Sequence, residues 1–201
     1  MNLILLPRNL ELIKKILPNN SQIGFIPTAG DVYENPYFVV DDKKKLLDNG
    51  YKVIDIDITN EDYNEIKNKL HNIDALFVAG GNVYYLMQQI KEKNLEKLII
   101  EYIKSNKLYI GSSAGSCICS PSLKPYQTLD DKTKAPNLKD LNGLNIVDFV
   151  VLPHYGKEKY QYIYDNILKE YDQDFNLVTL KDDETIIVTE KDKYEIIKLV
   201  N

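Results

Sequence analysis

A serine that could act as a nucleophile lies in the segment 111–115 (GSSAG), which fits the pattern G-x-S-x-G with Ser113 at its centre. An apolar run at 108–111 precedes the serine, and a helix is expected to begin near Ala114. This strand-turn-helix context is typical of a nucleophile elbow, in which a tight turn pushes the serine hydroxyl out of the sheet. Glycine is expected at 111 and 115 because neighbouring backbones approach closely there.

A serine nucleophile needs a general base, which is usually histidine, and the chain has two. His71 ends an amphipathic helical pattern, where a cation is favourable, and is interpreted as a surface residue. His154 follows the apolar run 149–152, just beyond the end of an expected buried strand. Because sites in α/β sheets assemble at the carboxyl ends of strands, His154 is the expected partner of Ser113.

A carboxylate should orient the imidazole and stabilise its charged form. The candidates between the serine and the histidine are Asp130, Asp131, Asp140 and Asp148. Asp130 and Asp131 lie in a long loop, 120–145, that several prolines interrupt and that could fold over the site. Asp148 precedes the strand that leads to the histidine.

A second glycine segment, 77–82 (FVAGGN), also runs from an expected strand into a helix. It matches neither the dinucleotide-binding nor the phosphate-binding glycine pattern. The backbone N–H of Gly81 could instead point at an oxyanion, because a glycine brings its amide close to a ligand. Cys117 and Cys119 lack the partners that a metal site needs, so no metal and no cofactor is expected.

The surrounding pattern alternates short apolar runs with longer amphipathic ones, which is typical of an α/β fold with a mainly parallel sheet. The expected strands are 3–6, 22–27, 52–57, 75–79, 108–111 and 149–152. The expected helices are 36–48, 61–71, 83–92 and 94–106. Three further strand patterns, 176–180, 185–189 and 194–199, suggest a small meander or hairpin at the end of the chain. A length of 201 residues fits a single domain, 1–201.

Composition excludes several classes of function. The net charge is −5 and Arg8 is the only arginine, so a nucleic-acid partner is not expected. No apolar stretch approaches the ~18 residues that span a bilayer, and no basic segment precedes the first apolar run, so neither a membrane partner nor a targeting signal is expected. Two cysteines separated by one residue suit a reducing cytoplasm, and a monomer or weak homodimer is expected there.

Four ordered segments together resemble the peptidase E (aspartyl dipeptidase) and cyanophycinase-like group of serine hydrolases. They are 24–29 (GFIPTA), 74–82 (DALFVAGGN), 109–116 (YIGSSAGS) and 153–155 (PHY). The resemblance implies a three-layer α/β sandwich of the class I glutamine amidotransferase-like fold.

The same resemblance implies roles for individual residues. Ser113 would be the nucleophile, His154 the base, and the amides of Gly81 and Ala114 the oxyanion hole. Its acid would fall at Asp131, with Asp130 as the second choice. The family commonly has threonine where this chain has Val83, and aspartyl dipeptidases use an arginine downstream of the histidine, whereas no arginine follows Arg8 here.

The leading hypothesis is therefore a serine-type peptidase that cleaves short peptides such as dipeptides through an acyl-enzyme. One alternative is an amidase of the glutamine amidotransferase type, although that class uses cysteine at the elbow. Another is a non-catalytic binding module on the same fold, whose sequence hallmark would be a missing member of the triad.

Overall fold

The chain is described by a computed structural model over residues 1–199, and its centre is a seven-stranded sheet in the order β3-β2-β4-β5-β1-β8-β9. The strands of this sheet are β1 (Leu3–Leu6), β2 (Gln22–Ile26), β3 (Lys52–Asp55), β4 (Ala75–Val78), β5 (Leu108–Ser112), β8 (Glu184–Glu190) and β9 (Lys193–Lys198). The first five strands pair in parallel, whereas β8 joins β1 antiparallel and β9 joins β8 antiparallel. The prediction of a mainly parallel central sheet is confirmed.

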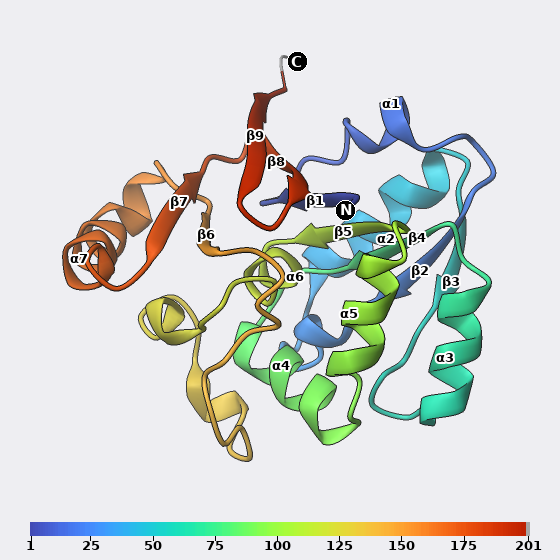
Figure 1. Cartoon of the computed structure of the whole chain (residues 1–201), viewed down its shortest axis with the longest axis horizontal. Helices are drawn as coiled ribbons and strands as arrows, with labels where there is room; N and C mark the ends of the chain where they lie inside the picture. The colour runs from blue at the N-terminus through green and yellow to red at the C-terminus, as the bar shows by residue number, and fades with distance from the viewer. Residues whose placement is uncertain (200–201) are drawn as a thin grey trace.

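Helices cover both faces of this sheet. They are α1 (Ile13–Ile16), α2 (Tyr37–Asp48), α3 (Tyr63–His71), α4 (Val83–Glu92), α5 (Glu96–Lys104) and α6 (Ala114–Cys117). Figure 1 shows α3, α4 and α5 together along one face. Successive residues of the strand β4 point to opposite faces of the sheet and belong to two separate hydrophobic cores. Leu76 packs with α3, α4 and α5, whereas Phe77 packs with α1 and α2. A strand buried on both faces has a continuous apolar run in its sequence, which is why the pattern of residues predicted an α/β fold with a mainly parallel sheet.

A second, two-stranded sheet lies beside the first and differs from the expected arrangement. Its strands β6 (Phe149–Pro153) and β7 (Asn176–Leu180) pair in parallel and are connected by helix α7 (Gln161–Tyr171) (Figure 1). The expectation that 176–180 belongs to a terminal meander is wrong, and only β8 and β9 form the hairpin. A parallel pair needs a crossover connection, and the helix α7 that provides it was not expected from the sequence.

Local signals explain where the helices begin and end. Asp62 caps α3 by accepting hydrogen bonds from the N–H groups of Asn64 and Glu65, and the Glu65 side chain completes a capping box. After α2, Gly50 has φ +81°, a conformation that favours glycine, as expected for a helix C-terminus. Within residues 1–199, no helix has the length and apolar character needed to cross a membrane.

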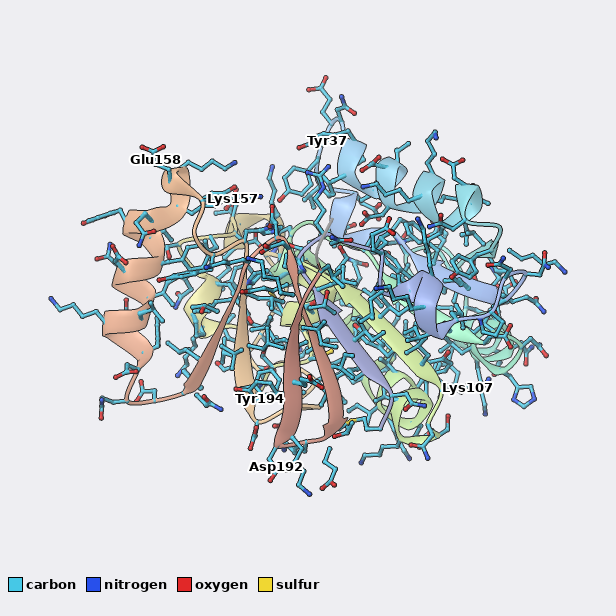
Figure 2. The ribbon with its side chains drawn as sticks, turned by 90° about the horizontal axis from the view of Figure 1, so that it is seen from above. Tyr37, Lys107, Lys157, Glu158, Asp192 and Tyr194 are labelled. Carbon is cyan, nitrogen blue, oxygen red and sulfur yellow. The ribbon has the colours of Figure 1, made fainter. Side chains whose placement is uncertain are left out.

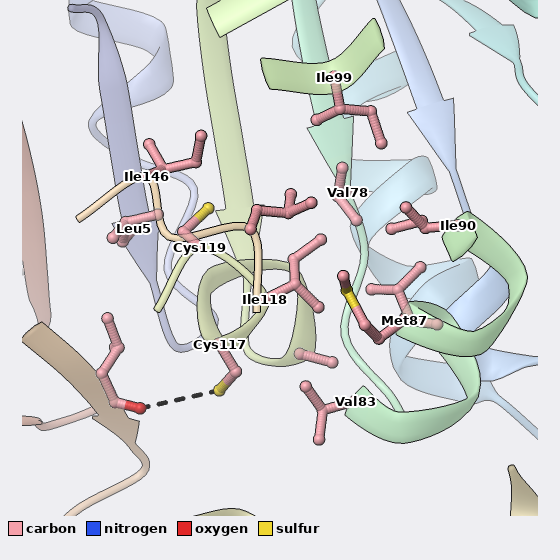
Figure 3. Close-up of a cluster of buried hydrophobic side chains, with 14 of the residues drawn as sticks. Leu5, Val78, Val83, Met87, Ile90, Ile99, Cys117, Ile118, Cys119 and Ile146 are labelled. Atoms are coloured by element: carbon pink, nitrogen blue, oxygen red, sulfur yellow. Dashed lines mark hydrogen bonds between the residues drawn. The ribbon is translucent and has the colours of Figure 1, made fainter. Parts of the chain in front are cut away.

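The long loop between α6 and β6 is ordered and contains two short 3-10 turns, η2 (Lys124–Tyr126) and η3 (Lys132–Lys134). Cys117 at the end of α6 and Ile118 and Cys119 at the start of the loop lie in the core with Val83 and Met87 of α4 (Figure 3). Both cysteines are buried and unpaired with each other. The loop therefore lies packed against α4, at the edge of the sheet where the strands end.

Candidate active site

Ser113 occupies a strained turn between β5 and α6. Its φ of 47° and ψ of −107° lie outside the regions that side chains usually adopt, as expected of a nucleophile elbow. The turn is possible because both flanking glycines lack a side chain. A Cβ on Gly115 would lie 2.1 Å from the carbonyl oxygen of Val78, and one on Gly111 would lie 2.4 Å from that of Gly115.

The hydroxyl of Ser113 faces His154, which in turn pairs with Asp182. Ser113 Oγ lies 3.0 Å from His154 Nε2, and His154 Nδ1 lies 2.7 Å from Asp182 Oδ1. The hydrogen bond from His154 lowers the pKa of Asp182 to about 2, against the opposing effect of burial, and a hydrogen bond from Lys157 adds to the lowering. An ionised carboxylate only accepts hydrogen bonds, so Nδ1 carries the proton and Nε2 of the neutral imidazole is left to accept one from the serine.

The pairing of β6 with β7 explains why His154 and Asp182 meet. Pro153 is in register with Leu180, so His154 and Asp182 leave the same end of two adjacent parallel strands. The N–H of Tyr155 donates to the carbonyl of Leu180 over 3.1 Å and holds the two chain segments together beyond the strands. His154 itself has φ 65°, which turns the chain sharply after β6.

The structure does not bring either expected acid to the position beside Nδ1. Asp131 is exposed and caps the turn η3, where its side chain accepts hydrogen bonds from Thr133. Asp130 faces the pocket, but its Oδ2 accepts the backbone N–H of Val83 over 2.8 Å. The place expected for Asp131 or Asp130 is taken by Asp182, because the loop docks on the N-terminus of α4 rather than over the imidazole.

The other two aspartates considered also lie elsewhere. Asp140 pairs with Lys91 over 2.5 Å. Asp148 precedes β6, whereas His154 follows it, so the length of the strand separates them.

Gly81 and Ala114 line the same pocket as Ser113. β4 and β5 are in register at Val78 and Gly111, so the segment after β4 reaches the same edge of the sheet as the serine. Gly81 has φ +141°, and a Cβ there would lie 2.0 Å from the carbonyl oxygen of Ala29. Among the hydrogen bonds found within residues 1–199, none has the N–H of Gly81 or of Ala114 as its donor.

These residues line one pocket of about 310 Å³. Its apolar walls include aromatic side chains from α2 and the segments before α2 and α7: Tyr33, Tyr37, Phe38 and Tyr160. Viewed from above, Tyr37 and Lys157 lie at one end of the molecule and the β8–β9 turn at Asp192 lies at the other (Figure 2). The pocket therefore opens at the carboxyl ends of the strands, where α/β folds place their sites.

Three charged residues of this region were not identified from the sequence. Asp182 follows β7, Arg8 follows β1, and Asp42 lies on α2; Arg8 and Asp42 line the pocket. Burial raises the pKa of Asp42 to about 7. The position of Arg8 just after an apolar strand was a usable signal, because carboxyl ends of parallel strands share one edge.

The thiol nearest the serine is unsuited to act as a nucleophile. Cys117 is buried, its Sγ lies 3.8 Å from the carbonyl oxygen of Val151 (Figure 3), and burial raises its pKa. A buried thiol of raised pKa stays protonated and unreactive. Among the described residues, no group of three histidine, cysteine or acidic side chains is placed to hold a metal ion.

Comparison with known proteins identifies the family to which the chain belongs. Residues 6–197 match the model of peptidase family S51. The chain is 39% identical over 170 residues to the uncharacterized peptidase Lmo0363 of Listeria monocytogenes, covering 85% of this chain and 83% of that one. It is 32% identical to the uncharacterized peptidase PM1590 of Pasteurella multocida, covering 87% and 84%.

A solved structure shares the whole fold. The crystal structure of a protein from Listeria monocytogenes that is named for peptidase E superposes with a TM-score of 0.91 at 35% identity. The match covers 99% of this chain and 98% of that one. The chain belongs to peptidase family S51 and is a serine peptidase of the peptidase E-like type.

Proposed function

We propose that this peptidase cleaves short peptides with Ser113 as nucleophile, His154 as general base and Asp182 as the carboxylate that orients the imidazole. The observation that carries the proposal is the continuous chain of contacts from Ser113 Oγ to His154 Nε2, 3.0 Å, and from His154 Nδ1 to Asp182 Oδ1, 2.7 Å. A nucleophile, a base and an orienting carboxylate in this order define a serine-hydrolase triad by geometry rather than by position in the sequence.

The proposed reaction has two halves. Ser113 Oγ attacks the scissile carbonyl carbon while its proton passes to His154 Nε2, and the carbonyl oxygen becomes an oxyanion held by the amides of Gly81 and Ala114. His154 then gives the proton to the leaving amine as the C–N bond breaks. Water, deprotonated by the same imidazole, hydrolyses the acyl-enzyme and restores the serine.

The size and position of the pocket support short substrates. A volume of about 310 Å³ lies at the lower end of the roughly 300–1,000 Å³ that is usual for ligand sites. Ser113 is only partly exposed and shares its pocket with aromatic side chains such as Tyr37 and Tyr160. A folded polypeptide would not reach the serine, so the proposed substrates are dipeptides and similarly short peptides.

The test combines labelling with a substrate screen. A fluorophosphonate probe should label the wild type on Ser113, identified by peptide mass spectrometry, and should not label Ser113→Ala. A dipeptide library incubated with both proteins should give products only with the wild type.

A matched control is Ser116→Ala, three residues along the chain, whose hydroxyl hydrogen-bonds within the core instead of facing the pocket. This variant should still be labelled when it is folded. Equal labelling of the wild type and Ser113→Ala would refute the assignment of the nucleophile.

A further inference from the structure

Arg8 is a cation that lines the active-site pocket together with Ser113. It is the only arginine of the chain and lies just beyond the end of β1. Its Nη2 lies 3.5 Å from Asp41 Oδ2, which is longer than a normal hydrogen bond between nitrogen and oxygen. Lys45 lies closer to the same oxygen of Asp41, at 2.7 Å. Arg8 is therefore held only weakly by its ion-pair partner.

The carboxylates around Arg8 do not cancel its charge. Asp41 is paired with a lysine of α2, and Asp182 is paired with Lys157. Asp42, which also lines the pocket, is 3% exposed, and burial raises its pKa to about 7. A carboxyl group is half protonated at its pKa, so up to about pH 7 Asp42 carries at most part of a charge. The sum of these charges is positive, so this part of the pocket favours an anion.

Arg8 lies on the leaving-group side of the nucleophile. The strands β4, β5, β1 and β8 are neighbours in this order. Gly81 follows β4, Ser113 follows β5 and Arg8 follows β1, so Arg8 and the proposed oxyanion amide lie on opposite sides of the serine. Asp182, which orients His154, precedes the antiparallel strand β8 and lines a second hollow together with Arg8. Because His154 gives its proton to the leaving amine in the proposed reaction, the residue that leaves lies on the same side as Arg8.

The distance along the chain fits one residue after the scissile bond. Leu6 is in register with Ser112, and the N–H of Ser113 donates to the carbonyl of Leu6 over 2.8 Å. Arg8 is two residues beyond this contact, and two residues of chain span at most about 7 Å. The Arg8 side chain can therefore reach a carboxylate that lies a single residue beyond the bond that Ser113 attacks.

We propose that Arg8 binds the free α-carboxylate of the residue that leaves, so that the enzyme selects peptides in which a single residue with a free C-terminus follows the scissile bond. This inference rests on the proposed function of Ser113. A guanidinium presents two parallel N–H donors that match the two oxygens of a carboxylate, so it fixes the orientation of the leaving residue as well as attracting it. A peptide with a further residue after the scissile bond would carry its carboxylate up to about 3.6 Å further away.

The experiment compares one substrate with its neutral form. The best dipeptide from the library screen is synthesised with a free C-terminal carboxylate and as the C-terminal amide, and the release of its first residue is followed. The values of kcat and KM for each are measured with the wild type, Arg8→Met, Arg8→Lys and Lys14→Met. Lys14 is the matched control, because its side chain has the same exposed fraction as that of Arg8, 44%, and pairs with Glu11 outside the pocket.

The wild type should prefer the free carboxylate by roughly 5–20-fold in kcat/KM, the lower part of the range for hydrogen bonds to charged groups, because Arg8 is partly exposed. Arg8→Met should lose most of this preference, mainly through a higher KM for the dipeptide with the free carboxylate. Arg8→Lys should keep part of it, since an ammonium group supplies the charge without the paired donors. Lys14→Met should keep the whole preference.

Two results would overturn the inference: a wild type that cleaves the amide and the free carboxylate equally well, or an Arg8→Met variant with the wild-type ratio. The first of these needs no variant, so it remains decisive if Arg8→Met fails to fold. The second is the result that a purely structural role of the ion pair with Asp41 would give, because both substrates would then be cleaved more slowly in parallel.

A second pair of dipeptides, with aspartate or asparagine as the first residue and the same second residue, tests the acyl side. If Arg8→Met abolished the discrimination within this pair but kept the preference for the free carboxylate, Arg8 would bind a side chain of the first residue and the inference would be wrong. Labelling by a neutral fluorophosphonate separates this failure from that of the proposed function. A wild type that is labelled on Ser113 but shows no preference for the free carboxylate keeps the nucleophile and loses only the carboxylate site.

Discussion

His154 Nδ1 lies 2.7 Å from Oδ1 of Asp182, a residue 28 positions further along the chain. The contact joins the ends of two parallel strands, β6 and β7, and puts the carboxylate on the side of the imidazole opposite to Ser113. The other carboxylate oxygen of Asp182, Oδ2, forms an ion pair with Lys157 Nζ over 2.6 Å. One carboxylate thereby fixes both the tautomer and the orientation of the ring.

Replacing Asp182 by asparagine should reduce kcat/KM for a dipeptide by roughly 10³–10⁴-fold, because the imidazole would adopt the wrong tautomer for accepting the serine proton. The measurement is steady-state hydrolysis of the best dipeptide, with thermal unfolding to verify folding. Asp183→Asn is the matched control, since Asp183 pairs with Lys198 outside the pocket. If Asp131→Asn slowed labelling of Ser113 as strongly as Asp182→Asn, the assignment of the acid would be wrong.

Lys157 should act as a positioning residue through Asp182. Lys157→Met removes the ion pair to Oδ2, and because that pair is partly exposed we expect a modest loss in kcat, roughly 3–10-fold, with little change in KM. Lys157→Arg should recover most of the rate. A large increase in KM in Lys157→Met would mean that the lysine contacts the substrate directly.

The close approach at the nucleophile elbow predicts a stability difference between two glycine-to-alanine substitutions. In Gly115→Ala the new Cβ would lie 2.1 Å from the backbone oxygen of Val78, so the sheet and α6 must separate. In Gly50→Ala nothing lies within 4 Å of the new Cβ, and only the strain of φ +81° remains, about 1–2 kcal/mol. Urea denaturation should therefore show a larger loss for Gly115→Ala, and the reverse order would contradict the backbone packing described here.

The burial of Asp42 predicts a pH dependence of stability. Its pKa is raised to about 7, so between about pH 4 and pH 7 the folded protein retains a proton that the unfolded chain releases. This group therefore makes the free energy of unfolding decrease as the pH rises through that range. The free energy of unfolding of Asp42→Asn minus that of the wild type should therefore be more positive at pH 8 than at pH 4, by on the order of a few kcal/mol.

The adjacent residue Asp41 is the control for this measurement. A hydrogen bond from Lys45 lowers the pKa of Asp41, so its contribution to stability is present at neutral pH and is lost as the pH falls. The free energy of unfolding of Asp41→Asn minus that of the wild type should therefore be more negative at pH 8 than at pH 4. An Asp42→Asn variant whose difference from the wild type is equal at pH 4 and pH 8 would show that Asp42 does not retain its proton on folding.

Features that depend on local pattern could be predicted from the order of the amino acids. The apolar runs at 3–6, 22–27, 75–79 and 108–111 predicted buried parallel strands, because a strand covered on both faces has little polar alternation. Ser113 was identifiable since its turn, its two glycines and its flanking elements are contiguous. His154 followed because it is one of two histidines and lies directly after a strand.

The identity of the carboxylate that faces His154 depends on how distant segments pack together. The aspartates nearest the serine in sequence lie on a loop that packs against α4, whereas Asp182 is separated from His154 by α7 and β7. The helix α7 was not recognised, so β7 was not expected to pair with β6. The relevant signal, an Asp-Asp turn after an apolar strand, becomes informative only once that pairing is known.

The pocket likewise depends on contacts between distant segments. Arg8, Asp42 and Asp130 come from the end of β1, from α2 and from the long loop, and the parallel register of the sheet brings these segments to one edge. The amino-acid composition gives the number of charged residues but not their positions in the folded chain. The pairing of Asp182 with His154 and Lys157 and the burial of Asp130 are properties of the folded chain, because they depend on which segments exclude water together.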